Sequence, residues 1–431
     1  MQAYIENIQP DSLTGAVFAI EGIKDACVIL NAPTGCKFYH SAVSDTQYLR
    51  GLSFDPAKYA DAFHMTQPRV PSTYLDGHDY VFGSGEKITT ILRELIKMDY
   101  KLIGIINSPG AALIGDDLDG FLAKEVKGIP CVGIENTGYS GNYSAGYQKA
   151  IIKVLDAIAL KPRMVRKKTV NLLGFHLYQK HFAENYQTLK SLLALCDIEV
   201  ISAPGAGDDV ETLTKVTETE CNVVVYPEYG MEIAQAMELK YQIPFRSLTE
   251  GPPIGFAATW SFVTEICDQL GADPQPAYDK IEKARATAYL HLARFSSLSG
   301  LPKGASFGIK AEASICYVLT KWLATYLGMV PVAISVLSDQ EDTFVRKLSD
   351  FLEQINALEI LHQPIDETSM HILFADGNTI ASLRLVEKKV SGVEISLPSL
   401  GYIDVTDKYI LGDEGALFLL EQIINGLQFL L

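Results

Sequence analysis

Short apolar runs alternate with amphipathic segments along the whole chain. In the first third, the runs at 26–30, 101–106 and 131–134 have the length and composition of buried strands. Before the second of them, apolar residues between 88 and 96 recur at helical spacing and mark one face of a helix. The pattern therefore predicts a repeated strand-and-helix organisation.

The same alternation returns twice more. Further strand-like runs lie at 170–175, 198–202, 222–226, 332–336 and 371–375, and helices are expected at 232–241, 278–294 and 344–355. Strands that alternate with helices and read as continuous apolar runs are typical of parallel sheets covered on both faces. We therefore predict an α/β fold of three Rossmann-like domains with parallel sheets flanked by helices. The domains are expected at 1–165, 166–275 and 276–431, the last opening on a linking helix.

The composition is that of a globular protein. Hydrophobic residues make up 48% and charged residues 20% of the 431 positions, and a chain of this length is expected to form two or three domains. The 52 acidic against 36 basic side chains give a net charge of -16. This excess argues against nucleic acid or an anionic membrane as a partner. The densest basic stretch, 161–168, precedes a strand and is interpreted as a solvated linker.

The N-terminus carries no basic segment followed by an apolar one, so we expect no secretory signal and a cytoplasmic protein. Seven cysteines without disulfide-framework spacing also suit a reducing compartment. The longest apolar stretch, 311–337, is interrupted by Lys321 and Pro331. It predicts a helix followed by a strand and not a membrane span.

Cys36 is the leading candidate for chemistry. It follows the apolar run at 26–30 in a loop rich in glycine and proline, and the crevice beyond the carboxyl ends of parallel strands is the usual ligand site of open α/β sheets. A thiolate there binds a metal or attacks a substrate. The other six cysteines lie in or near apolar elements and are interpreted as small buried hydrophobic residues.

Two further strand-end loops should reach the same crevice, one at 107–110 and one at 135–141. Each loop alone reads as an ordinary turn, whereas three together favour a site. The chain has no G-x-x-x-x-G-K-[ST] segment, so we expect no nucleotide to be bound by it. C-x-x-C and H-E-x-x-H are also absent, which argues against a self-contained zinc site. His40 is a candidate base or ligand, although a structural hydrogen bond is the simpler interpretation.

Several segments resemble a known family. These segments are the run from Gly15 to Cys36, 80–87 (Tyr-Val-Phe-Gly-Ser-Gly-Glu-Lys), 108–117 (Ser-Pro-Gly-Ala-Ala-Leu-Ile-Gly-Asp-Asp), 129–139, 170–174, 237–244 and 412–416. In the same order, they resemble segments of the component 1 subunits of nitrogenase and nitrogenase-like reductases. The resemblance covers nearly the whole chain. Its most specific part runs from the Val-Phe-Gly segment to the Ile-Gly-Asp-Asp segment.

The resemblance implies a paired subunit that receives electrons from a separate P-loop iron protein. In this family the electrons pass through an iron–sulfur cluster at the subunit interface to a substrate held at a second site. Cys36 matches a cluster-ligand position, and Gly35 and Asn136 lie in matching segments of the cofactor-binding edge. The implied cofactor is an iron–sulfur cluster, of the [4Fe-4S] type or another, shared between the subunits of a homo- or hetero-oligomer. In dark-operative protochlorophyllide reductases, one subunit supplies an aspartate in place of a cysteine ligand.

The departures from the family are equally informative. Asp11 or Ser12 stands where the family has an upstream cysteine, and Ser108 stands where it has another. One thiolate cannot hold a four-iron cluster, which takes about four ligands. The remaining ligands would come from Asp11, from a second subunit, or from nowhere. The strand end at 226–230 also lacks the cysteine that anchors the cofactor of molybdenum nitrogenase, which argues against nitrogen fixation.

Three hypotheses follow. The first is a nitrogenase-like oxidoreductase subunit that reduces an unidentified small molecule and binds metal through Cys36. The second is a non-catalytic cofactor-binding or assembly scaffold of the same fold, which the missing cysteines favour. The third pairs Cys36 with His40 as a nucleophile in an unrelated enzyme, but no orienting third group is evident. Catalytic residues cannot be named from the sequence.

Overall fold

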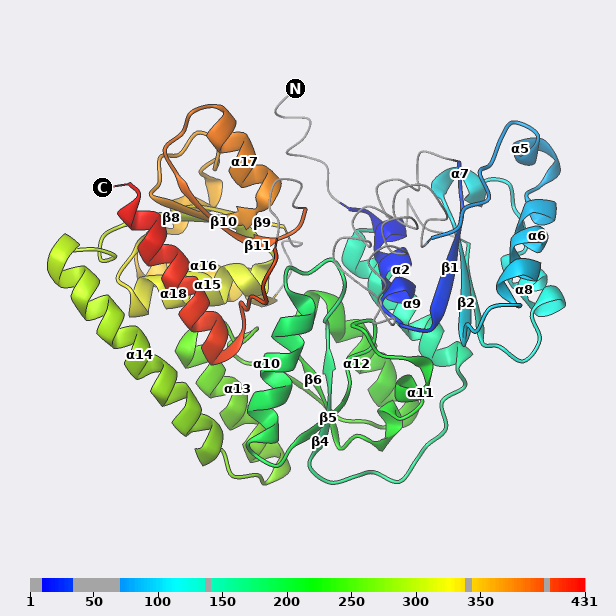
Figure 1. The fold of residues 1–431 in the computed structure, drawn as a ribbon, viewed down its shortest axis with the longest axis horizontal. Coiled ribbons are helices and arrows are strands. Elements are labelled where there is room, and N and C mark those ends of the chain that lie inside the picture. The colour runs from blue at the N-terminus through cyan, green and yellow to red at the C-terminus, as the bar shows by residue number, and fades with distance from the viewer. Residues whose placement is uncertain (1–9, 34–69, 136–140, 338–342, 399–403, 431) are drawn as a thin grey trace.

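The computed structural model describes residues 10–33, 70–135, 141–337, 343–398 and 404–430. It contains three separate sheets whose printed pairings are all parallel, each covered by helices (Figure 1). The predicted fold class, an α/β protein with three parallel sheets flanked by helices, is therefore confirmed. The sheets lie within the residue ranges proposed for the three domains.

The first sheet has the order β1-β2-β3, with strands β1 (Ala26–Asn31), β2 (Leu102–Asn107) and β3 (Cys131–Ile134). Every residue of β1 and β2 is buried, because helices cover both faces of the sheet. The helices are α2 (Ser12–Glu21), α5 (Asp79–Phe82), α6 (Gly85–Leu95), α7 (Pro109–Ala112), α8 (Leu118–Glu125) and α9 (Tyr143–Ala157).

The second sheet has the order β5-β4-β6-β7. Its strands are β4 (Thr169–Leu173), β5 (Glu199–Ser202), β6 (Cys221–Val224) and β7 (Phe245–Ser247). The helices that accompany it are α10 (Phe182–Ala194), α11 (Val210–Leu213), the short 3-10 helix η1 (Val216–Glu218) and α12 (Pro227–Tyr241). A buried pair of asparagines links two neighbouring strands, because Asn171 Nδ2 of β4 donates to Asn222 Oδ1 of β6 at 2.9 Å.

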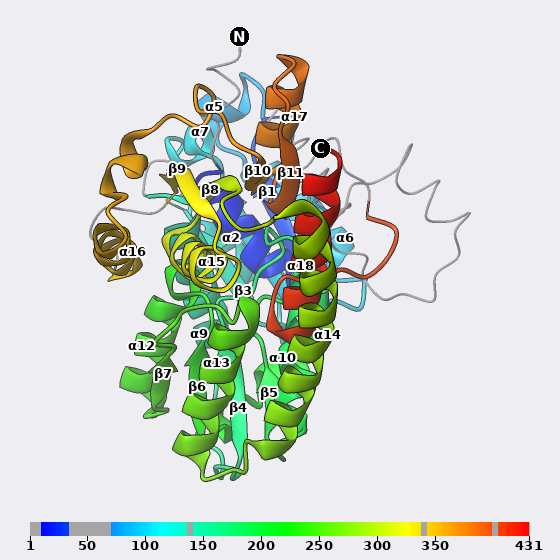
Figure 2. The same cartoon turned by 90° about the vertical axis from the view of Figure 1, so that its left-hand side faces the viewer.

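The third sheet has the order β11-β10-β8-β9. Its strands are β8 (Ser306–Ala311), β9 (Val330–Val336), β10 (Ile372–Asp376) and β11 (Ser391–Ser396), and its helices are α15 (Ala313–Tyr326), α16 (Thr343–Gln354), η2 (Leu358–His362) and α17 (Gly377–Leu385). Helices α13 (Gly255–Leu270) and α14 (Gln275–Ser299) link it to the second sheet. Helix α18 (Gly412–Gln428) packs against both of these helices (Figure 2).

Helices α2 and α9 pack backbone against backbone. A Cβ placed on Gly15 would lie 2.0 Å from the Tyr143 carbonyl oxygen, and one placed on Gly146 would lie 2.0 Å from the Ser12 carbonyl oxygen. Only glycine fits at both positions, because real Cβ contacts are not that short. This contact fixes the start of α2 against the start of α9.

Both tryptophans of the chain belong to the helices that follow the second sheet. Trp260 of α13 stacks on Tyr278 of α14, with ring centroids 3.8 Å apart. Trp322 of α15 is 4% exposed and packs against Gly255 at the start of α13. Among the described residues, no helix is both long and apolar enough to cross a membrane.

Candidate functional site

The carboxyl ends of β1 and β2 meet at one edge of the first sheet, as the parallel order requires. The last residues of the two strands, Asn31 and Asn107, are register partners, and both side chains are buried. Helix α2 leads directly into β1 and packs on it, so its first turn lies at this same edge. The edge is therefore where the residues before Cys36 and the start of α2 come together (Figure 1).

A buried hydrogen-bond network centres on Asn31. Asn31 Nδ2 donates to Asn107 Oδ1 at 2.8 Å and to Ser84 Oγ at 3.0 Å. Asn31 Oδ1 accepts from Thr73 Oγ1 at 2.8 Å, and Thr73 Oγ1 accepts in turn from the Ala32 amide at 3.1 Å. Both ends of the asparagine side chain are thus satisfied, and the chain just before the Cys36 loop is held in one position.

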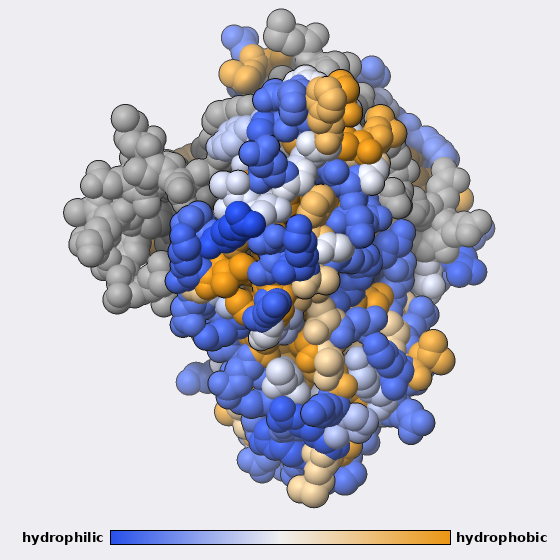
Figure 3. Space-filling model, turned by 90° about the vertical axis from the view of Figure 1, so that its right-hand side faces the viewer, coloured by the Kyte–Doolittle hydropathy of each residue, from blue (hydrophilic) through white to orange (hydrophobic). Residues whose placement is uncertain are grey.

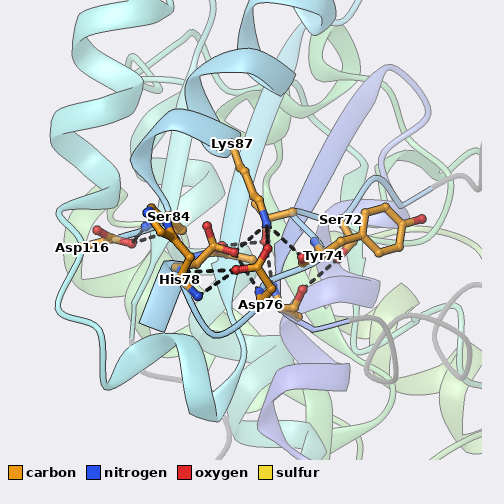
Figure 4. A network of polar contacts seen from close by, with 11 residues as sticks. Ser72, Tyr74, Asp76, His78, Ser84, Lys87 and Asp116 are labelled. Atoms are coloured by element: carbon orange, nitrogen blue, oxygen red, sulfur yellow. Dashed lines mark hydrogen bonds and ion pairs between the residues drawn. The ribbon is translucent and has the colours of Figure 1, made fainter. Parts of the chain in front are cut away.

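The network extends to the two segments that carry the most specific family resemblance. Ser84 donates to Asp116 Oδ2 through its backbone amide at 2.9 Å and through its hydroxyl (Figure 4). Gly83 lies beside them at a φ of +93°, and a Cβ there would lie 2.9 Å from Asp116 Oδ1. The hydrogen bonds from Ser84 to Asp116 therefore join segments 80–87 and 108–117.

Lys87 ties the neighbouring loop together. Its ammonium donates to Asp79 Oδ2 at 2.6 Å, to Asp76 Oδ2 at 3.1 Å and to the Tyr74 carbonyl oxygen at 3.1 Å (Figure 4). These carboxylates raise the pKa of Lys87, with Asp79 the larger cause, and the hydrogen bond from Lys87 lowers the pKa of Asp76. The interactions hold residues 74–79 against the first turn of α6.

Asp11 and Ser12, the expected substitutes for one cysteine, lie at the start of α2. Asp11 is the N-cap residue, and its Oδ1 accepts from the Thr14 amide at 3.0 Å and from Thr14 Oγ1 at 2.9 Å. Its backbone also bridges to Asn142, the N-cap of α9. Ser12 is 3% exposed and packs against Gly146.

Ser108, the expected substitute for a second cysteine, is the N-cap of α7. Its hydroxyl accepts from the Ala111 amide at 3.3 Å, and the residue is 1% exposed. Asp117 likewise caps α8 by accepting from the Gly120 amide at 2.8 Å. Capping satisfies helix amides that would otherwise have no partner.

The described residues do not by themselves fit an iron–sulfur cluster. Asp11 and Ser108 are engaged as helix caps, and no group of three or more His, Cys, Asp or Glu side chains in the described ranges is arranged to hold a metal. Cys36, Gly35, His40 and Asn136 lie outside the described residues. Their parts in the site remain predictions.

The predicted burial of the other six cysteines is confirmed for all but Cys131. Five are buried and Cys131 is half-buried. Burial raises the pKa of the Cys131 and Cys221 thiols to about 11 and that of Cys267 to about 12. Because the thiolate is the form that binds metals, these groups are poor ligands at neutral pH.

A second polar cluster, which the sequence did not reveal, lies where the three domains meet. Tyr143 of α9 is 5% exposed, and its hydroxyl is 2.9 Å from His176 Nδ1 in the loop after β4. The Tyr229 hydroxyl, on α12, donates to Glu312 Oε1 at 2.6 Å, just after β8. His176 and Tyr229 are in ring contact, with centroids 4.1 Å apart.

Burial sets the protonation of this cluster. It holds the pKa of His176 well below 6.5, so the imidazole is neutral at pH 7. Burial, followed by the Glu312 carboxylate, raises the pKa of Tyr229. The phenol thus stays protonated and remains the donor. The members of the cluster are distant in sequence, and no spacing motif could have connected them.

Three parallel sheets, with a polar network at the strand ends of the first and a polar cluster joining all three, define an α/β protein built on three helix-covered sheets. Residues 12–428 match the family model described as "Nitrogenase component 1 type Oxidoreductase". The chain belongs to this family.

Relatives with different roles match at similar levels. The chain is 25% identical over 276 residues to the nitrogenase iron-molybdenum cofactor biosynthesis protein NifE of Clostridium pasteurianum, covering 63% of this chain and 55% of that one. It is 24% identical over 450 residues to the nitrogenase iron-iron protein beta chain of Rhodobacter capsulatus, covering 96% and 91%. A light-independent protochlorophyllide reductase subunit from Methylocella silvestris is 26% identical over 278 residues, covering 61% and 49%.

The match thus spans about half the length of the first and third of these relatives. The solved structure titled "Nitrogenase Cp1 at pH 6.5" superposes with a TM-score of 0.73 at 17% identity, covering 98% of this chain and 92% of that one. This likeness supports the fold. The family contains oxidoreductases and a biosynthesis protein, and the names of the first two relatives refer to an iron-molybdenum cofactor and an iron-iron protein.

Proposed function

We propose that the chain is a nitrogenase-like oxidoreductase subunit that accepts electrons from a separate P-loop iron protein. In this proposal Cys36 contributes to an iron–sulfur cluster at the interface with a second component 1-like subunit, and a small molecule is reduced in the cleft between the domains. We do not assign the particular activity of any one relative to this chain, because the family includes a biosynthesis protein as well as oxidoreductases.

The observation that carries the proposal is the ordered edge of the first sheet. Asn31 is held by Thr73, Ser84 and Asn107, five residues before Cys36. Of the seven cysteines, the six described ones are packed in the interior. Cys36 is therefore the thiol best suited to bind iron, and its partners would come from a second subunit, from the second oxygen of Asp11 or from Ser12, with Gly35, Asn136 and Ser108 shaping the site.

An exposed apolar surface beside this edge supports a protein partner. Tyr80, Val81 and Phe82 of α5 are 42%, 72% and 74% exposed, and Leu113 at the end of α7 is 84% exposed. Tyr80 packs over Gly110, so α5 and α7 are neighbours. Figure 3 shows this side of the molecule, where apolar residues interrupt a largely hydrophilic surface. Such patches mark interaction sites.

Iron binding by the anaerobically purified chain tests the proposal. Wild-type protein, alone and mixed with a component 1-like partner subunit, should contain iron and show a thiolate-to-iron absorption band. Cys36→Ala should lose most of both while keeping its unfolding temperature. Cys131→Ala is the matched control and should keep its iron, because that thiol is half-buried in β3 and has a raised pKa.

The second candidate function is a cofactor-binding or assembly scaffold. The helix-capping roles of Asp11 and Ser108, at positions where the family has cysteines, favour it, as does the similarity to a cofactor biosynthesis protein. Absence of iron from the wild-type chain in both preparations, together with an unchanged Cys36→Ala variant, would overturn the reductase proposal and leave the scaffold.

A further inference from the structure

Two of the buried cysteines are hydrogen-bond partners of each other. The thiol of Cys267 donates to the sulfur of Cys196, and both cysteines are free. The thiols of Cys131, Cys221 and Cys316 instead donate to backbone carbonyl oxygens. Cys196 and Cys267, which are distant in sequence, thus form a pair of thiols in direct contact.

The pair lies where the ends of three helices meet (Figure 1). Cys196 follows α10 in the turn that leads to β5, and Cys267 lies in the last turn of α13. The first turn of α14 also reaches the pair, because the Ala277 amide donates to the Cys196 sulfur. The two thiols therefore join the second domain to the helices that link it to the third sheet.

The pair is buried just below the surface. Cys196 and Cys267 are 3% and 1% exposed, whereas Leu195 and Asp197, on either side of Cys196, are exposed. Asp197 has a φ of +58°, so the chain turns sharply directly after Cys196. Local opening of this short turn is enough to admit a molecule of about the size of water to the Cys196 sulfur.

The hydrogen bonds make Cys196 the more reactive of the two thiols. Its sulfur accepts from Cys267 and from the Ala277 amide at a helix N-terminus, and both contacts stabilise a thiolate. Burial raises the pKa of both thiols, and that of Cys267 reaches about 12 because the Cys196 sulfur adds to the effect. Cys196 therefore ionises first, although little of it is thiolate at pH 7.

The charged groups around the pair act in the same direction as burial. Asp273 raises the pKa of both thiols, Asp197 that of Cys196 and Asp268 that of Cys267. No cation is among the causes that act on either thiol. The pair is therefore stable as two thiols near neutral pH and reacts slowly.

We propose that Cys196 and Cys267 form an oxidation-sensitive site, at which hydrogen peroxide converts the two thiols to a disulfide between the ends of α10 and α13. The Cys196 thiolate attacks the peroxide and becomes a sulfenic acid, with release of hydroxide. The Cys267 sulfur then displaces the sulfenic hydroxyl group, which leaves as water with the Cys267 proton. Two thiols and one hydrogen peroxide thus give one disulfide and two water molecules.

Peptide mapping of the full chain tests the proposal. Protein treated with hydrogen peroxide is alkylated, digested without reduction and analysed by mass spectrometry. A disulfide-linked pair of peptides containing Cys196 and Cys267 should appear and should be lost on reduction with dithiothreitol. Its rate of formation should rise about tenfold per pH unit above pH 7, because the thiolate is the reacting form. The cross-link restricts the unfolded chain and should raise the unfolding temperature by about 5 °C.

Variants locate the cross-link. Cys267→Ser should abolish it, whereas Cys221→Ser is the matched control and should form it as wild type, because that buried thiol donates to a backbone carbonyl. Cys36→Ala should form it as well, since neither Cys36 nor iron takes part. This result separates the disulfide from the proposed redox function. Folded wild-type protein that yields no linked Cys196 and Cys267 peptides, or yields other pairs in equal amount, would overturn the proposal.

Discussion

At the scale of single residues, burial decides which side chains are available for chemistry. The thiol of Cys316 and the imidazole of His176 would be reactive in water, yet both are packed in the interior. Burial raises the pKa of the first and lowers that of the second, so each is neutral at pH 7. The Ser108 hydroxyl is likewise engaged, because as the buried N-cap of α7 it accepts a hydrogen bond from the Ala111 amide.

The buried histidines predict an acid-sensitive fold. Burial lowers the pKa of His181 to about 4 and that of His176 well below 6.5. Below pH 6.5 the unfolded chain takes up protons that the folded chain does not. The stability these residues contribute is therefore complete above pH 6.5 and decreases as the pH falls, by about 1.4 kcal/mol per pH unit for each histidine.

Urea unfolding between pH 5 and 7 measures this dependence. His176→Gln keeps a hydrogen-bonding group for Tyr143 but cannot be protonated, so it should remove about half of the slope due to the two histidines. His362→Gln, an exposed change, should leave the slope as it is. An unchanged slope in His176→Gln would show that His176 is already protonated in the folded protein.

At the scale of elements, the contact between α2 and α9 positions the candidate site. Gly15 and Gly146 let the two helices approach until their backbones touch. Asp11 and Asn142, the N-caps of the two helices, pair through their backbones at the end of this contact. The position of Asp11 at the sheet edge thus depends on two glycines that bear no functional group.

Replacing one of these glycines should therefore disturb both stability and the site. We expect Gly146→Ala to destabilise the protein by about 1–3 kcal/mol, because its Cβ would meet the Ser12 carbonyl and force the helices apart. Thermal unfolding measures the change. Gly77→Ala is the control, since a Cβ there has no atom within 4 Å. Equal stability of the two variants would mean that α2 moves freely against α9.

At the scale of the whole molecule, buried charges join the second and third domains. Lys180 comes from the second and Glu394 from the third, and Asp404 precedes α18. A single hydrophobic cluster also runs through residues of all three domains. The three sheets are therefore not independent units, and a change at a junction should affect the whole fold.

Removing the lysine tests this coupling. Lys180→Met should cost about 3–5 kcal/mol, because two carboxylates are left in the junction without their cation. Adding Glu394→Gln to that variant should recover part of the loss, as a double-mutant cycle would measure. Lys97→Met is the control, because its ion pair with Glu94 is exposed and contributes little. A cost below about 1 kcal/mol for Lys180→Met would show that water reaches the junction.

The sequence predicted most of the strands and the convergence of strand ends, because buried parallel strands are continuous apolar runs. It did not predict the three-residue β7, nor β8 and β11. The last two contain polar residues. Lys310 interrupts β8, and Glu394 and Ser396 interrupt β11. Lys310 pairs with Asp376 of the neighbouring strand β10, and Glu394 pairs with Lys180 of the second domain. The network of Asn31, Ser84 and Asp116 was also beyond sequence reasoning. Its hydrogen-bonded pairs, Asn31–Ser84 and Ser84–Asp116, are 53 and 32 residues apart, and only the fold brings them together.

The placement of the two tryptophans determines what intrinsic fluorescence can report. Trp260 lies in α13, between the second and third sheets, and Trp322 lies in α15 of the third sheet, whereas the first domain has neither. Emission will therefore follow the loosening of α13 and α15 and stay unchanged when the edge of the first sheet alone opens. Far-ultraviolet circular dichroism senses all three domains. A denaturation curve in which the two signals separate would accordingly identify the first domain as a unit that unfolds by itself.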